Sequence, residues 1–210
     1  MGTDIHMRVE YRPRLYEYKN NRLEGYTGEW HSADLFRMPV NGEDSYRVIE
    51  LWENRDYGLF ATLANVRNYG DTVYIDTPRG LPDDSCEYIK KELGDCDEWG
   101  HSASYFTLKE LYDFYKKYGE IRRSGMISSA DRDKLDIEGI TPESWCQGTN
   151  QEGWERREWT EKNWSLERLI NKLKIRAEEL GMCYDFDFER NNDRAISAME
   201  NIRIVFCFDS

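Results

Sequence analysis

Hydrophobic and polar positions alternate most regularly at the two ends of the chain. Near the start, Ile5, Met7, Val9 and Tyr11 alternate with polar residues, and this pattern predicts a half-buried strand. Near the end, residues 202–208 place apolar side chains on both faces, which predicts a strand in the centre of a sheet. Less regular stretches predict further strands at 46–52, 72–76 and 182–188, and a hairpin at 30–36.

Apolar residues at helical spacing predict helices between these strands. The expected helices, each with a polar start signal and a glycine or polar stop, run from Asp56 (or Asn54) to Asn68, from Asp84 to Gly94, from Thr107 to Gly119 and from Trp164 to Gly181. Two of them carry capping boxes, formed by Asp84 with Glu87 and by Thr107 with Glu110. Residues 95–104 and 139–153 are expected to be loops, with a helical turn at 128–135.

These elements predict an α+β fold in which the N- and C-terminal strands belong to one mixed or antiparallel sheet and several helices pack on it. The length of 210 residues is enough for one core, and no linker divides the chain. We therefore expect a single globular domain, residues 1–210. Its motif-bearing part is residues 1–119, and its helix-hairpin part is residues 120–210.

Charge and cysteine content narrow the classes of function. A formal net charge of −12 argues against direct binding of DNA or RNA, because such proteins cluster cations against phosphates. The five cysteines form no Cys-x-x-Cys pair, which favours free thiols in a reducing compartment. The chain has no signal-peptide pattern and no apolar run of membrane-spanning length. We expect a cytoplasmic protein with no membrane association, and a homo-oligomer remains open.

Two polar segments around the predicted helix 84–94 form the main candidate site. Arg79 offers a guanidinium fork for phosphate or carboxylate, and Asp83 or Asp84 can bind hydroxyl groups or a cation. A turn followed by an aspartate cap explains Asp84 equally well but does not explain Arg79.

The second segment, Gly100 to Ser104, precedes the helix capped by Thr107, and helix N-termini favour anions. His101, Ser102 and Ser104 are therefore the expected anion contacts. Tyr57, Tyr105 or one of the tryptophans at 145, 154, 159 and 164 is a candidate for stacking on a ring of the ligand, although tryptophans at such irregular spacing also serve to anchor a helix. The glycine patterns of common nucleotide-binding enzymes and the nucleophile elbow of serine hydrolases are absent from the sequence.

A divalent metal is the alternative ligand. Asp4 and His6 lie two residues apart on the first predicted strand, so they share a face, and His101 or Asp83 would complete a set of ligands. An outward-facing polar edge of a strand also produces such a pair without any metal. No other cofactor is expected.

The first half of the chain, through Glu110, resembles a family of uncharacterised bacteriophage and prophage proteins. The resemblance rests on four motifs: Met-Gly-Thr-Asp-Ile-His at residues 1–6, Asp-Tyr-Gly-Leu-Phe-Ala-x-Leu-Ala-x-Val-Arg-Asn at 56–68, Pro-Arg-Gly-Leu-Pro-Asp-Asp at 78–84, and residues 100–110, which begin Gly-His-Ser-Ala-Ser-Tyr. Members of that family often carry His where this chain has Ala103, and Cys where it has Thr3. If those positions hold a metal in the family, this chain lacks potential ligands.

The resemblance implies an accessory protein of a phage, acting in the bacterial host cell. Together with the polar segments, it suggests that the protein binds a small phosphorylated or nucleotide-like ligand, such as a host defence signal that it sequesters. Two alternatives stay open. One is a metal-dependent hydrolase or nuclease built on Asp4, His6, Asp83 and His101, and the other is an acidic inhibitor of a host defence protein.

Overall fold

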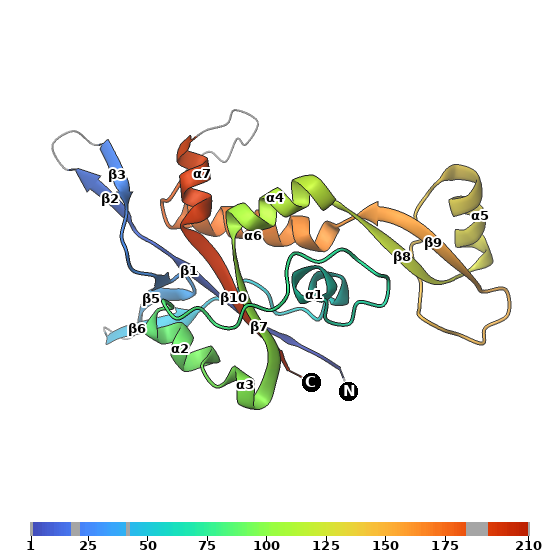
Figure 1. The fold of residues 1–210 in the computed structure, drawn as a ribbon, viewed down its shortest axis with the longest axis horizontal. Coiled ribbons are helices and arrows are strands. Elements are labelled where there is room, and N and C mark those ends of the chain that lie inside the picture. The colour runs from blue at the N-terminus through green and yellow to red at the C-terminus, as the bar shows by residue number, and fades with distance from the viewer. Residues whose placement is uncertain (1, 18–21, 41–42, 184–192, 210) are drawn as a thin grey trace.

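A four-stranded antiparallel sheet lies at the centre of the protein (Figure 1). The computed structural model describes residues 2–17, 22–40, 43–183 and 193–209. The strands of the sheet, in spatial order, are β4 (His31–Ser32), β1 (Ile5–Tyr11), β10 (Ile202–Asp209) and β7 (Gly100–Thr107). β1 pairs with β10 from Ile5 opposite Phe208 to Tyr11 opposite Ile202. The predicted pairing of the two terminal strands and the α+β class are confirmed.

β10 has the central position that its two apolar faces predict. Ile204, Phe206 and Phe208 lie in the main core on one face of the sheet. Val205 and Cys207 lie in a second, smaller core on the opposite face. Because both sides of β10 are removed from water, this strand needs no polar face.

Helices cover the two faces of the sheet unequally. Those that contribute to the main core are α1 (Tyr57–Ala64), α4 (Leu108–Tyr118), α6 (Trp164–Glu179) and α7 (Asp193–Glu200). On the other face, α2 (Glu87–Leu93) and α3 (Cys96–Trp99) contribute the apolar side chains of the smaller core. Figure 1 shows α4 and α6 on one side of the sheet and α2 and α3 on the other. None of the helices in the described segments is both long and apolar enough to span a membrane.

Most of the predicted helix starts are confirmed, and one is wrong. Asp56 caps α1 through the Leu59 N–H, and Thr107 and Glu110 form the expected capping box of α4. The Asp84–Glu87 box does not form, because Cys86 is the cap residue of α2 and Asp84 is bound elsewhere in the fold. α1 also ends earlier than predicted. Its C-terminal cap is the residue that follows Ala64, in the left-handed conformation.

Two small hairpins lie between β1 and α1, where the sequence predicts a hairpin at 30–36 and a strand at 46–52. They consist of β2 (Arg14–Glu17) with β3 (Arg22–Tyr26), and β5 (Leu35–Val40) with β6 (Glu43–Val48). The strand predicted at 46–52 is therefore β6, shifted toward the N-terminus. Residues 72–76 form no strand. Of the strand predicted at 182–188, residues 184–188 lie outside the described part of the chain.

A two-stranded arm projects from the body and was not predicted as such. It consists of β8 (Glu120–Ile127), α5 (Ser129–Glu138) and β9 (Glu155–Lys162) (Figure 1). β8 and β9 pair along their whole length, from Glu120 opposite Lys162 to Ile127 opposite Glu155. None of the directly opposite residues of β8 and β9 form a pair of two apolar side chains, and β9 is mostly charged, so the sequence shows little of the alternation that marks a sheet strand.

Candidate functional site

The segment Gly100 to Ser104, predicted as a loop, is strand β7 at the edge of the central sheet. The sequence does not reveal this strand, because several of its side chains are small or carry a hydroxyl group. Ala103 and Ser104 are nevertheless buried. The strand edge is covered by the Pro78 segment: the Gly80 N–H donates to the Ala103 carbonyl at 2.9 Å, and the Arg79 N–H donates to Ser104 Oγ at 3.3 Å. Ser104 therefore holds two segments together. Covering an edge in this way protects it from pairing with other chains.

Arg79 is engaged by its own neighbourhood. Its guanidinium donates to Asp76 Oδ2 at 3.0 Å and to Glu110 Oε1 at 2.7 Å, and it lies over the ring of Phe106 at 4.6 Å. The Tyr105 carbonyl accepts a further hydrogen bond at 3.3 Å. These contacts fix the Pro78 segment against β7 and α4.

Asp84 is exposed, and it pairs with a charge network whose other members, Arg203 and Glu10, are buried. It accepts hydrogen bonds from Arg203 and from the Trp30 indole, both at 2.9 Å. Burial opposes ionisation, but these hydrogen bonds and the charge of Arg203 prevail and lower the pKa of Asp84. Arg203 also pairs with the fully buried Glu10 at 2.8 Å. Asp83, which precedes Asp84 in the sequence, is also exposed.

The pair proposed for a metal is occupied by protein partners. Asp4 receives two hydrogen bonds from Arg55, at 2.7 and 2.6 Å, and these lower its pKa. His6 Nε2 lies 3.3 Å from Asp209 Oδ2, and its ring meets the edge of Trp99. Among the residues that the structure describes, no group of three or more His, Cys, Asp or Glu side chains is arranged to hold a metal ion.

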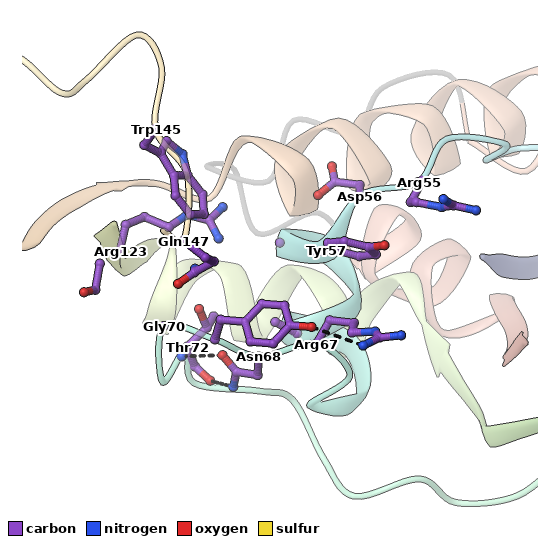
Figure 2. A pocket seen from close by; sticks show the side chains of 14 residues that line it. Arg55, Asp56, Tyr57, Arg67, Asn68, Gly70, Thr72, Arg123, Trp145 and Gln147 are labelled. Atoms are coloured by element: carbon purple, nitrogen blue, oxygen red, sulfur yellow. Dashed lines mark hydrogen bonds between the residues drawn. The ribbon is translucent and has the colours of Figure 1, made fainter. Parts of the chain in front are cut away.

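A cavity of about 410 Å³ lies between α1 and the base of the arm (Figure 2). We call it the first cavity. Arg55 precedes α1, Arg67 follows α1, and Arg123 comes from β8, so three separate segments each contribute an arginine to its wall. Tyr57, which the sequence had suggested for stacking, also lines it, as do Tyr69 and Trp145. The first cavity therefore combines cations with aromatic rings.

Each arginine of the first cavity is held in place by a defined partner. Arg55 is oriented by Asp4, and Arg123 Nε donates to Glu161 Oε1 at 2.9 Å. Arg67 donates through Nε to Thr3 Oγ1 at 3.1 Å and through Nη1 to the Tyr69 hydroxyl at 3.2 Å. Its backbone adopts the left-handed conformation, with φ of 52°. Such backbone strain is kept only where the surrounding contacts enforce it.

Two glycines permit close approaches at the wall of the first cavity. A Cβ atom at Gly58 would lie 2.6 Å from Arg123 Nη2, so the absence of a side chain lets this guanidinium rest on the first turn of α1. A Cβ atom at Gly125 would lie 2.7 Å from Trp145 Cε3, so the indole packs directly on the backbone of β8. Figure 2 shows Arg123 and Trp145 on the arm side of the cavity, with Tyr57 on the α1 side.

The first turn of α1 lines the same wall through Tyr57 and Gly58. The N–H groups of Tyr57 and Gly58 belong to this turn and have no partner within the helix. Asp56 contributes the one carboxylate in the lining. It is turned toward the protein, because its two oxygens accept from the Leu59 N–H at 3.0 Å and from Ser165 Oγ at 2.6 Å.

A second cavity, of about 430 Å³, lies next to the first and shares Arg67 with it. Thr3 from the start of the chain, Pro78, and the predicted pair His101 and Ser102 line its wall. His101 Nδ1 lies 2.9 Å from Ser102 Oγ, and the ring stacks on Phe208 at 5.9 Å between centroids. The opening segment, the Pro78 segment and the Gly-His-Ser segment thus meet here.

The predicted site residues are therefore distributed over several places. His101 and Ser102 line the second cavity, and Tyr57 lines the first. By contrast, Arg79, Ser104 and Tyr105 lie at the covered edge of β7, and Asp84 lies in the network around Arg203, so these are not brought together with His101 into one pocket. Whether any of them contacts a ligand stays a prediction.

Sequence reasoning did not identify the arginines of the first cavity as candidate site residues. Arg67 falls at the end of the helix predicted from Asp56 to Asn68, where it is expected only to help close the helix. Arg123 lies in the arm, whose strands are not predicted. The turn that carries Arg67 could have been recognised from Asn65 and Asn68. Asparagine tolerates the left-handed conformation, which Asn65 adopts. Comparisons of the chain with protein-family models, curated proteins and solved structures gave no match.

Proposed function

We propose that this protein binds a small phosphorylated or nucleotide-like ligand in the first cavity. The observation that carries the proposal is the presence of Arg55, Arg67 and Arg123 in the lining of one concave site that also contains aromatic rings. The chain as a whole carries a formal net charge of −12, whereas the described lining of this cavity contains three arginines and one carboxylate, Asp56. Guanidinium groups are the preferred protein donors to phosphate oxygens.

The pairing of two arginines with carboxylates is compatible with this role. Asp4 occupies the Nε and Nη2 atoms of Arg55, and Glu161 occupies Nε of Arg123. Each carboxylate engages one edge of a guanidinium and fixes its orientation, while the group retains further N–H donors. Side chains held in this way lose less entropy when a ligand binds.

The aromatic side chains provide the second part of the proposed recognition. Tyr57, Tyr69 and Trp145 line the first cavity, and their ring faces suit a nucleobase or another flat ring. A volume of about 410 Å³ falls within the usual range of small-molecule sites. A phosphate held by the arginines would leave the rings to contact the remainder of the ligand.

The resemblance to bacteriophage proteins supports a biological role for such binding. An accessory protein made by a phage would gain from removing a nucleotide-like defence signal of the host. Sequestration needs affinity but no catalytic group, and the chemistry of the first cavity is that of a binding site. Asp56, its one carboxylate, already has partners in the protein.

A pair of neighbouring arginine variants tests the proposal. Arg123→Gln removes a cavity cation, whereas Arg122→Gln is the matched control, because Arg122 is exposed, pairs with Glu158 and does not line the cavity. Binding of nucleoside mono-, di- and triphosphates is measured by isothermal titration calorimetry, with circular dichroism as the check on folding. A lost charged hydrogen bond costs about 1.5–3 kcal/mol, so Arg123→Gln should weaken binding about 10- to 100-fold.

The control should bind as the unmodified protein does. The proposal is wrong if none of these compounds binds, or if both variants lose affinity equally. Affinity should also fall as salt is raised, because the phosphate contacts are electrostatic.

A further inference from the structure

Arg67 is the only residue that lines both cavities among the residues described for their walls. Its guanidinium reaches toward each of them. Nε donates to Thr3 Oγ1 in the wall of the second cavity, and Nη1 donates to the Tyr69 hydroxyl in the wall of the first. An anionic group bound by Arg67 would therefore lie at the junction between the two spaces.

The two cavities differ in charge on either side of this junction. The first contains Arg55 and Arg123 in addition to Arg67. The described lining of the second contains no other arginine and no lysine, and its polar groups are hydroxyls, a carboxamide and the His101 imidazole. The first cavity is suited to an anionic group, and the second is suited to an uncharged group that carries hydroxyls or a ring.

The two volumes are nearly equal, at about 410 and 430 Å³. Each falls within the range for a small-molecule site by itself. A mononucleotide with its phosphate on Arg67 would fill one cavity and leave the other to solvent. A ligand with a second half of similar size would use both.

Building on the proposed function, we propose that the ligand consists of two nucleoside-like halves joined through a phosphate. The bridging phosphate lies at Arg67. The half in the first cavity carries a further phosphate toward Arg55 or Arg123 and stacks on the aromatic rings there. The half in the second cavity is uncharged and contacts the hydroxyls of Thr77 and Ser102, with Tyr74 as its aromatic neighbour.

Short nucleotides of defined length test this inference. The probes are the four common 5′-mononucleotides and the four corresponding 5′-phosphorylated dinucleotides, each with one phosphodiester, measured by isothermal titration calorimetry. Because a dinucleotide fills both cavities, the best dinucleotide should bind at least about tenfold more tightly than the best mononucleotide.

A blocking variant shows where the additional affinity originates. Thr77 lines the second cavity and is exposed, so Thr77→Trp fills that space without disturbing the core. Val73→Trp is the matched control, because Val73 is exposed in the same segment and lines neither cavity. Thr77→Trp should remove the advantage of the dinucleotide and leave mononucleotide affinity unchanged. Val73→Trp should change neither affinity.

The outcomes separate this inference from the proposed function. If mononucleotides bind and dinucleotides bind no more tightly, the inference is overturned and the proposed function stands. The same conclusion follows if Thr77→Trp leaves the advantage of the dinucleotide intact. If neither set of probes binds, the proposed function fails together with the inference.

Discussion

Asp34 provides a quantitative test of how burial controls charge in this core. Its carboxylate is fully buried and accepts hydrogen bonds from the Val9 N–H at 2.8 Å and from Arg176 Nη1 at 3.3 Å. Burial raises the pKa of Asp34 from 3.8 to about 6. The hydrogen bond from Val9 and the charges of Arg176 and Arg8 lower the pKa, but they offset only part of the effect of burial.

The direction of the pH effect follows from the two pKa values. The folded protein binds the Asp34 proton more tightly than the unfolded chain does, because the pKa is higher in the folded state. The stability that this proton contributes is fully present below the unfolded value of 3.8 and is lost as the pH rises through about 6. A shift of this size corresponds to about 3 kcal/mol of unfolding free energy, and about half of it is present at pH 5.

Comparison with Asp34→Asn isolates this contribution. The variant keeps an oxygen acceptor for the Val9 N–H but has no titrating group at this position, while all other carboxylates are common to both proteins. Urea denaturation followed by tryptophan fluorescence gives the unfolding free energy at several values between about pH 8 and about pH 5. The difference between the unmodified protein and the variant should move in favour of the unmodified protein by about 1 kcal/mol or more as the pH falls. A constant difference, or one that moves the other way, would mean that Arg176 keeps Asp34 ionised and that the reasoning is wrong.

Further predictions concern the charge network, the core and the covered sheet edge. Glu10→Gln removes the buried charged partner of Arg203 and leaves it only the exposed Asp84, so unfolding free energy from urea titration should fall by about 3–5 kcal/mol. Leu169→Ala should cost about 2–5 kcal/mol because Leu169 is fully buried, whereas Ile175→Ala, on the exposed side of the same helix, should change stability by less than about 0.5 kcal/mol. Arg79→Gln should lower the melting temperature, because it breaks the pairs with Asp76 and Glu110, and should leave nucleotide affinity unchanged. A loss of affinity without a loss of stability would place the ligand at Arg79 instead.

The central sheet could be predicted from the sequence because burial leaves a direct pattern there. β1 has one face in the core, and its apolar residues alternate accordingly. β10 is buried on both faces, and its apolar run from Ile204 to Phe208 indicates a central strand. The capping box at Thr107 was equally readable, because it depends on residues that are close in the sequence.

The arm could not be predicted because few of its strand residues are buried. The buried ones are Ile121, Gly125 and Ile127 in β8 and Trp159 in β9, and the other residues of β9 are mostly charged and at least partly exposed. Pairing of Arg123 with Glu161 and of Arg122 with Glu158 depends on the register of two strands far apart in the sequence. The local sequence of either strand does not indicate this register.

The candidate site was only partly predictable for a related reason. His101 and Ser102 were identified from their chemistry, and the structure places them at a cavity. The arginines of the first cavity come from a segment before α1, a turn after it and the arm. Arg79 drew attention in the sequence as an unexplained cation, but its carboxylate partners are Asp76, three residues earlier, and Glu110, which only the fold brings near.

The most direct test of ligand binding at the first cavity is an NMR titration that observes arginine and tryptophan side-chain N–H signals, assigned by single substitutions. The probe is the phosphorylated nucleotide that binds best in calorimetry. The signals of Arg55, Arg67 and Arg123 and the Trp145 indole should shift together as the probe is added, while those of Arg79 and Arg203 should stay in place. Shifts confined to Arg79 or Arg203, or no shift at saturating probe, would contradict binding in the first cavity.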